Sequence, residues 1–462
     1  MTYNSGMLTA ETATPLSYRR ILSTWWPLAA SWLLMGLELP VLSAVMARLP
    51  NPAINLAAYG GIVFPLALII ESPVIMLLAA STALSKDYAS YQLIRRFMLV
   101  SAVALTGLHI LIAFTPLYYF VAVQVLGAPE VIVEPGRIGL MLMTPWTTSI
   151  AYRRFNQGVL IRYNHSKKVG IGTVVRLSAD LIVLLVGYTI GSIQGIIVAT
   201  CAVSAGVISE AIYSGIVVRP VVNTQVREMG PVKPALTMST FQKFYIPLVL
   251  TSLLTLLVQP IGSAALSRMP LALASLAVWP VLSGLTFMFR SVGMAYNEVV
   301  VALLEKPLST QKLRRFTAYL TAATTLLIML VALTPISLVW FQALSGLEQD
   351  LAEMAVIGLA IGIPTAGFTV LQSWFQGILL HGGRTRAITE AVVLFLVTCS
   401  ALLWFGVTRG EYTGLFWTMA SFTAAMFLQT LWLWYRSRSE ERAVQKRDDL
   451  ISIPATMTSA SD

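Results

Sequence analysis

Charged side chains are scarce in this sequence. Asp, Glu, Lys and Arg make up 11% of the 462 residues and hydrophobic side chains make up 56%, whereas a soluble domain carries roughly 25% charged residues. Most of the protein surface therefore cannot face water. The net charge of +10 does not indicate a nucleic-acid-binding protein, because the basic residues lie in short connections and in the tail.

Cysteine and histidine are also rare. Cys201 and Cys399 both lie in apolar runs, so we expect neither a structural disulfide nor a thiolate metal site. His109, His165 and His381 are scattered, which predicts no metal site, and nothing indicates a cofactor. The sequence lacks a nucleotide-binding P-loop, a Ser-His-Asp spacing and a paired-histidine motif. A membrane-embedded enzyme would need histidines or carboxylates that converge at one depth, and the three histidines do not converge. We therefore predict that the protein is not an enzyme.

Long apolar runs recur along nearly the whole chain. Each approaches the roughly 20 residues that a helix needs to cross a bilayer, and in a bilayer such segments must be helices to satisfy their backbone internally. The sequence predicts an all-α polytopic membrane protein with spans at 21–47, 57–83, 96–121, 138–160, 169–190, 194–217, 241–267, 272–300, 316–341, 354–380, 387–408 and 412–435.

The order of these spans predicts two lobes of six helices each. Residues 1–20 are polar without a cleavable signal pattern, and we predict a cytoplasmic N-terminus there. Residues 21–218 form the first lobe, 219–240 a polar cytoplasmic linker, 241–435 the second lobe and 436–462 a cytoplasmic tail. Lys and Arg concentrate in alternate connections and in the tail, which by the positive-inside bias places both termini in the cytoplasm.

The two lobes are the same apolar module written twice, about 219 residues apart. The matches include Thr115-Pro116 with Thr334-Pro335, Gly127 with Gly346, Pro40 with Pro260, and Arg48-Leu49-Pro50 with Arg268-Met269-Pro270. Six spans return the chain to its starting side, so the repeat is parallel, with its pseudo-two-fold axis along the membrane normal. Duplicated bundles of this kind usually hold a substrate between the copies and move one against the other, which predicts transport.

Some charges lie deep inside predicted spans, where a charge is costly and therefore a functional candidate. Glu38 and Glu71 precede prolines in the first two spans, and Arg290 lies in the eighth. We predict that the two glutamates couple transport to H⁺ or Na⁺. The repeat alignment places Glu71 on Arg290, so the two could pair across a central cavity in one state and separate in another. The alternative is a static pair between helices or an interfacial charge.

Polar side chains form stripes on three helices of the second lobe. They comprise Ser283, Thr286, Gly293 and Asn297 around Arg290; Ser252, Thr255, Gln259 and Ser263; and Thr365, Thr369, Gln372 and Gln376. Ser and Thr often bond between membrane helices, but this explains Gln and Arg less well. We therefore predict a wet cavity lining whose substrate-binding residues are Arg290, Asn297, Gln259, Thr255, Thr286, Gln372 and Gln376.

Other intramembrane charges have simpler explanations. Arg176 and Asp180 lie four residues apart and share a helix face, which predicts a structural pair that neutralises itself. Glu210 and Glu390 lie toward the ends of spans, where they are expected to anchor the helix or reach the interface.

Two stretches resemble a known superfamily. Phe155-Asn156-Gln157-Gly158-Val159-Leu160, followed by Asn164-His165, is repeated by Phe375-Gln376-Gly377-Ile378-Leu379-Leu380-His381-Gly382-Gly383-Arg384-Thr385. The second stretch resembles the turn after the fourth or tenth span of multidrug and toxic compound extrusion (MATE) proteins, whose superfamily also holds polysaccharide-lipid flippases. Trp26-Pro27-Leu28, Pro247-Leu248, Ser267-Arg268 and Ser178-Ala179-Asp180 are most similar to the progressive ankylosis exporters.

The resemblance implies a V-shaped, twelve-helix transporter that works by alternating access. The ankylosis branch implies export of a polyvalent organic anion such as citrate, a nucleotide or pyrophosphate, and Arg290 suits such a substrate. The alternatives are an organic-cation antiporter driven by H⁺ or Na⁺, favoured by Glu38 and Glu71, and a lipid-linked glycan flippase. We expect a monomer in a plasma membrane, specifically the bacterial inner membrane, with the lipid bilayer and a small organic ion as its partners.

Overall fold

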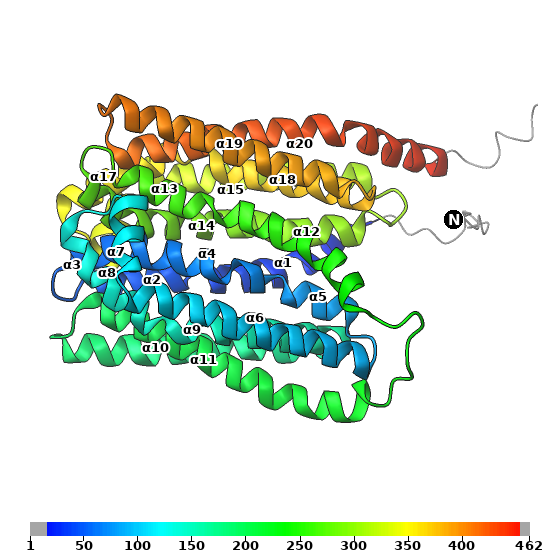
Figure 1. Ribbon diagram of the computed structural model, residues 1–462. Coiled ribbons are helices and arrows are strands. Elements are labelled where there is room, and N and C mark those ends of the chain that lie inside the picture. The colour runs from blue at the N-terminus through cyan, green and yellow to red at the C-terminus, as the bar shows by residue number, and fades with distance from the viewer. Residues whose placement is uncertain (1–15, 453–462) are drawn as a thin grey trace, which may run out of the picture.

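The computed structural model describes residues 16–452, which are helical and contain no strand. The helices, four of which are short π-helices (η), lie roughly parallel in one bundle (Figure 1). They are α1 (Tyr18–Gly36), α2 (Glu38–Met46), α3 (Pro52–Ala58), η1 (Tyr59–Val63), α4 (Phe64–Ile75), α5 (Leu77–Leu84), α6 (Tyr88–Phe114), α7 (Leu117–Tyr119), η2 (Phe120–Val125), α8 (Glu130–Leu142), α9 (Thr144–Arg162), α10 (Ser166–Ile190), α11 (Gly195–Val221), η3 (Val222–Val226), α12 (Met238–Leu256), α13 (Val258–Leu266), α14 (Ala272–Leu303), α15 (Thr310–Ala332), α16 (Ile336–Val339), η4 (Trp340–Leu344), α17 (Gln349–Ile361), α18 (Pro364–His381), α19 (Thr385–Arg409) and α20 (Gly414–Ser452).

The predicted all-α membrane architecture is confirmed. Ten helical segments within the described residues are long and apolar enough to cross a membrane. The two other predicted spans, 138–160 and 412–435, are helical as well and correspond to α8–α9 and to α20. Because these two fall outside the set of ten, the count of twelve spans stays a prediction.

Prolines break the first span of each half at the same place. Leu37 separates α1 from α2, and Leu257 separates α12 from α13. Pro40 and Pro260 each follow the break by three residues. Proline has no amide proton to donate to the carbonyl four residues earlier, so the helix loses a hydrogen bond at the break and changes direction there.

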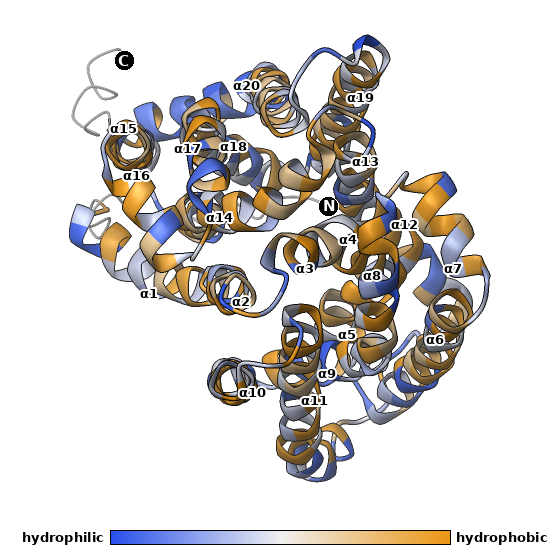
Figure 2. Ribbon diagram, turned by 90° about the vertical axis from the view of Figure 1, so that its left-hand side faces the viewer, coloured by the Kyte–Doolittle hydropathy of each residue, from blue (hydrophilic) through white to orange (hydrophobic). Residues whose placement is uncertain are grey.

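The helix before each break packs against the opposite half of the protein. Helix α1 packs on α14, where the Trp25 indole donates to the carbonyl of Val292 at 3.2 Å. Helix α12 packs on α4, where the Tyr245 hydroxyl donates to the carbonyl of Pro73. Figure 2 shows α1 beside α14 and α12 beside α4. Residues 21–36 and 238–256 therefore cross between the two predicted lobes.

The halves also meet at the end of the bundle that carries α3, α7, α8 and α17, opposite the chain termini (Figure 1). We call this the outer end, since it is the side predicted to be extracellular, and the other the inner end. Helix α3 packs on α14 there, and a Cβ at Gly60 would lie only 2.8 Å from Cδ of Pro280. The Ser263 hydroxyl donates to the carbonyl of Gly61. Close backbone approach thus closes the outer end.

At the inner end, the extension of α20 beyond residue 435 braces the second half. Asp448 accepts a hydrogen bond from the backbone N–H of Thr310, the first residue of α15, at 2.9 Å. The neighbouring Arg447 donates to the carbonyls of Leu304 and Lys306. A carboxylate at a helix N-terminus satisfies a donor that has no partner within the helix. The predicted tail therefore begins as a helix that caps α15.

Replacing Asp448 with asparagine is expected to lower the free energy of unfolding by about 0.3–1 kcal/mol, because the amide keeps an acceptor oxygen but loses the negative charge at the N-terminus of α15. Burial raises the pKa of Asp448, but hydrogen bonds from Thr310 and Arg447 outweigh it and hold the pKa below its usual value. The stabilisation is thus complete above the unfolded pKa, near 3.9, and is lost as the pH falls through the lower folded value. Thermal unfolding in detergent at neutral and acidic pH measures the difference, which should shrink in acid. The exposed neighbour Asp449, which accepts from Gln445, provides the control Asp449→Asn.

Candidate functional site

A cavity of about 870 Å³ lies between the two halves. It follows α14 from Trp279 to Glu298, with walls from α1, α2, α12, α18 and α20. At the outer end its lining residues Tyr59, Gly60 and Trp279 are buried, whereas Glu298 toward the inner end is exposed. The cavity is therefore closed at the outer end.

The three polar stripes of the second half converge on this cavity. Helices α12, α13, α14 and α18 bring to its wall every residue predicted to bind substrate: Arg290, Asn297, Gln259, Thr255, Thr286, Gln372 and Gln376. Two of the amide side chains also form hydrogen bonds with neighbouring helices. Gln372 donates to the Thr430 hydroxyl at 3.0 Å, and Asn297 donates to the carbonyl of Ser373 at 3.3 Å. Their polar groups are thereby held in fixed orientations at the wall.

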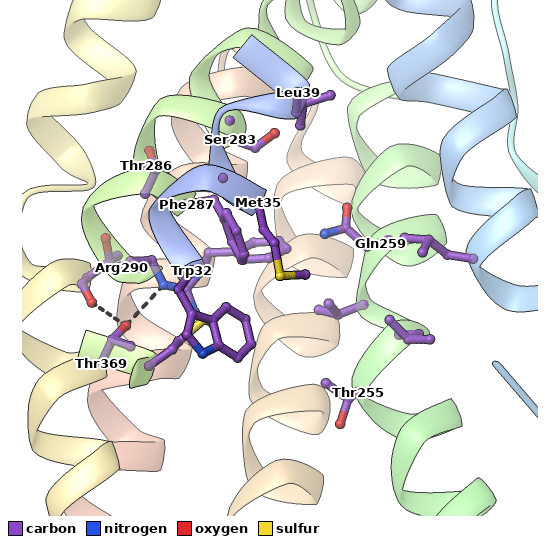
Figure 3. A pocket seen from close by; sticks show the side chains of 18 of the residues that line it. Trp32, Met35, Leu39, Thr255, Gln259, Ser283, Thr286, Phe287, Arg290 and Thr369 are labelled. Atoms are coloured by element: carbon purple, nitrogen blue, oxygen red, sulfur yellow. Dashed lines mark hydrogen bonds between the residues drawn. The ribbon is translucent and has the colours of Figure 1, made fainter. Parts of the chain in front are cut away.

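Arg290 is the cation of this wall. Its Nε donates to the Thr369 hydroxyl at 3.1 Å, and that hydroxyl donates onward to the carbonyl of Thr365 at 2.9 Å (Figure 3). Among residues 16–452 none of the seven ion pairs includes Arg290. Thr369 thus orients the guanidinium, and no carboxylate of the described residues forms an ion pair with it. Trp32 and Phe287 give an apolar surface beside it.

The wall on the side of the first half carries a paired charge. Glu38 and Arg176 both line the cavity and form an ion pair between α2 and α10. The predicted Arg176–Asp180 pair is therefore not self-contained, because Nε of Arg176 lies 3.9 Å from Oδ2 of Asp180 while its terminal nitrogen reaches Glu38. Both carboxylate oxygens of Asp180 are buried and have no hydrogen-bond partner in the described part of the chain.

Glu71 lies behind the cavity wall. It is 3% exposed, is absent from the lining residues, and accepts a hydrogen bond from the indole of Trp146, which does line the cavity. In this conformation Glu71 and Arg290 do not form a pair. The two positions are equivalent in the repeat but have different surroundings, because α4 presents Glu71 to α9 while α14 presents Arg290 to the cavity.

Sequence reasoning missed a second ion pair in the first half. Glu210 is predicted from the sequence to anchor its helix or reach the interface. Instead, Glu210 is 1% exposed, forms an ion pair with Arg153 and accepts from Gln157 at 2.8 Å. The signal available in the sequence was the spacing of Arg153 and Gln157, which lie four residues apart and therefore share one face of α9. Glu390 does lie near the inner end, beside Arg386 and Arg436.

The comparisons with known proteins concern the fold. No family model and no curated protein match the sequence. Among solved structures, an inward-facing MATE-family multidrug resistance transporter of the MOP superfamily matches with a TM-score of 0.67 at 14% identity, over 91% of this chain and 99% of that chain. The lipid II flippase MurJ, in an inward closed conformation, matches with a TM-score of 0.66 at 13% identity, over 94% of both chains.

A third match is a MOP superfamily transporter from Pyrococcus furiosus, described as having a binding pocket of reversed polarity. Its TM-score is 0.60 at 13% identity, over 94% of this chain and 99% of that chain. The coverage shows that the likeness extends over the whole bundle and both halves. The ankylosis branch stays a prediction, but the superfamily fold is confirmed: this chain has the fold of MATE transporters and of the MurJ flippase.

Proposed function

We propose that the protein is a secondary transporter that exports a small organic anion by alternating access, with the anionic group of the substrate bound at Arg290. The observation that carries the proposal is an oriented guanidinium in the wall of a large cavity between two repeated halves, with no carboxylate partner in the part of the chain that the structure describes.

An unpaired charge away from bulk water is costly, and the anionic group of a substrate would supply the missing partner. Arginine suits this role because its planar fork can donate two parallel hydrogen bonds to a carboxylate or phosphate. Asn297 and Gln376 lie along the same wall and provide further polar contacts, while Trp32 and Phe287 can cover the carbon skeleton. Citrate, nucleotides and pyrophosphate are the first substrates to test.

The buried charges of the first half support coupling to a cation. Within the predicted spans of the first half, the buried or half-buried carboxylates of Glu38, Glu71, Asp180 and Glu210 outnumber the similarly placed guanidinium groups of Arg153, Arg154 and Arg176 by four to three. Full ionisation would leave one excess negative charge in a low-dielectric interior, which a proton or a sodium ion would neutralise. Asp180, whose oxygens have no hydrogen-bond partner, joins the predicted Glu38 and Glu71 as a place for that cation.

The same excess of carboxylates favours a second candidate, an organic-cation antiporter. Glu38 and Glu298 line the cavity and would attract a cationic drug, although Glu38 is already paired with Arg176. A glycan flippase has less support, because its polyanionic lipid-linked substrate would need a more cationic cavity. With Arg176 neutralised, Arg290 is the unpaired lining arginine among the described residues.

The test is efflux from proteoliposomes loaded in parallel with labelled citrate, labelled ATP or a cationic dye. Anion efflux above that of protein-free liposomes supports the proposed function. Dye efflux that requires a proton or sodium gradient, with no anion efflux, contradicts it and supports the antiporter.

Replacing Glu38 with glutamine is expected to flatten the pH dependence of transport, because glutamine can neither bind nor release a proton. Asp180→Asn should act in the same direction. Initial rates of efflux measured from acidic to alkaline pH test this, with Glu390→Gln as a control outside the cavity. An unchanged pH profile in both variants would exclude these carboxylates from coupling.

A further inference from the structure

Two arginines that the repeat places in equivalent positions each reach from one half of the protein to the other. Arg48 follows α2 at the outer end. Its Nη1 donates to the carbonyl of Ala44 in its own helix at 2.7 Å, and its Nη2 donates to the carbonyl of Ala343 in the second half at 2.5 Å. The acceptor belongs to η4, the short helix between α16 and α17.

Arg268 makes the reciprocal contact. It follows α13, and its Nη1 donates to the carbonyl of Ala264 in its own helix at 2.8 Å. The guanidinium then reaches the first half, where it donates to the carbonyls of Gln124, Val125 and Leu126 at 2.8–2.9 Å. These carbonyls lie at the end of η2, which occupies the same place in the first half as η4 in the second.

Both contacts use the same chemistry. The last carbonyls of a helix have no partners within the helix and carry its partial negative charge, so a guanidinium binds them by charge-assisted hydrogen bonds. The two arginines are exposed, and the bonds can therefore exchange with water when the halves separate.

A glycine in each half makes room for the opposite arginine. Gly127 and Gly346 have φ of +68° and +75°, which side chains rarely adopt. A Cβ at Gly127 would lie 2.8 Å from Cζ of Arg268, and one at Gly346 would lie 2.9 Å from Nη1 of Arg48. The repeated glycines thus form the receiving surfaces of the repeated arginines.

The position of the two contacts gives them a mechanical consequence. They bridge the halves at the outer end, beyond the buried lining residues Tyr59 and Trp279 that close the cavity there. Opening the cavity at this end requires the halves to move apart, and this would break both sets of cross-half hydrogen bonds while leaving those to Ala44 and Ala264 intact.

We propose that Arg48 and Arg268 are twin latches that hold the cavity closed at its outer end and set the balance between the inward-facing and outward-facing conformations. This inference rests on the proposed alternating access, and it assigns the control of access to polar contacts outside the cavity. Neither arginine lines the cavity, so both act on the conformational equilibrium alone.

The test measures access to the cavity from the outer side. A cysteine replaces Met419, which lines the cavity and is 5% exposed, in a parent with Cys201 replaced by serine. Labelling by a membrane-impermeant maleimide added outside intact cells measures the exposure of this cysteine to the outer side. Arg48→Gln and Arg268→Gln should each raise the labelling rate, and the double variant should raise it by roughly tenfold or more. The lysine variants, which keep the charge but lose the fork, should fall between.

Arg137→Gln is the matched control. Arg137 also donates to two carbonyls, those of Ala113 and Phe114, but both belong to its own half. Equal labelling in the parent and in the double latch variant, or the same increase from Arg137→Gln, would overturn the proposal. A second variant locks the latch: Arg48→Cys with Ala343→Cys, joined by a bifunctional thiol reagent, should suppress both labelling and efflux.

The readouts separate this inference from the proposed function. Labelling of Met419→Cys needs no substrate, so increased labelling without efflux of any tested anion supports the latches and contradicts the anion exporter. Normal anion efflux with unchanged labelling contradicts the latches alone.

Discussion

Replacing Arg290 with alanine is expected to abolish transport of the anionic substrate while the protein still inserts and purifies. The guanidinium is oriented by Thr369 and lacks a carboxylate partner within the described residues, so no ion pair of the protein itself depends on it. The substrate would lose its counter-charge at the wall of the cavity. Truncation of one partner of such a pair costs about 2–4 kcal/mol, or roughly 30- to 1,000-fold in Kd.

Binding of the labelled anion to purified protein and efflux from proteoliposomes measure this loss separately. Arg290→Lys keeps a point charge without the fork and should retain part of the binding. Arg409, exposed at the end of α19 outside the cavity, provides the control Arg409→Ala. Anion efflux at the wild-type rate in Arg290→Ala would remove Arg290 from the binding site.

Thr369 offers a finer test of the same site. Its hydroxyl fixes Nε of Arg290, so Thr369→Val should weaken anion binding without removing the cation. The effect should be smaller than that of Arg290→Ala, about 1 kcal/mol for one hydrogen bond. This ordering distinguishes a positioned guanidinium from a merely electrostatic one.

The sequence located the polar wall of the cavity well because the signal is local. A side chain such as Gln259 or Gln376 in an otherwise apolar span must face water or protein, and helical spacing then decides which neighbours share its face. The same logic predicted Thr255 and Asn297, and all of these residues line the cavity.

The pairing of charges could not be predicted in this way. Helical spacing places Arg176 beside Asp180, but its partner Glu38 is 138 residues away in the sequence. Glu210 and Arg153 meet because α9 and α11 pack together, and their positions near predicted span ends favoured the interface instead. Which ionic groups meet depends on tertiary packing that periodicity does not encode.

The repeat likewise identified equivalent residues but not the residues that they contact. Arg48 aligns with Arg268 and Gly127 with Gly346, yet nothing in the alignment shows that each arginine meets the glycine of the opposite half. The crossing of α1 and α12 was also not predicted, because a break at Leu37 or Leu257 gives no direction for the helix before it. Two copies of a module define a symmetry axis, but not the distance between the copies.

Removing Arg153 is expected to cost more stability than any other single change considered for this protein. Arg153→Ala would leave the carboxylate of Glu210, 1% exposed, with Gln157 as its remaining hydrogen-bond partner. Breaking a buried pair by deleting one partner costs about 3–5 kcal/mol, because an uncompensated charge stays buried. Chemical or thermal unfolding in detergent should show this as a large drop in the midpoint.

The loss of stability is expected to come from the unpaired charge of Glu210, and a double variant tests this. In Arg153→Met with Glu210→Met both charges are replaced by apolar side chains, so we expect most of the lost stability to return, since such replacements are often neutral or stabilising. The pair between Arg386, 92% exposed, and the half-buried Glu390 gives the comparison: replacing Arg386 with alanine should cost at most about 1 kcal/mol. A double variant as unstable as Arg153→Ala would show instead that packing between α9 and α11 requires these side chains themselves. Recovery of stability with loss of transport would indicate that the first half keeps its buried ions for the mechanism rather than for the fold.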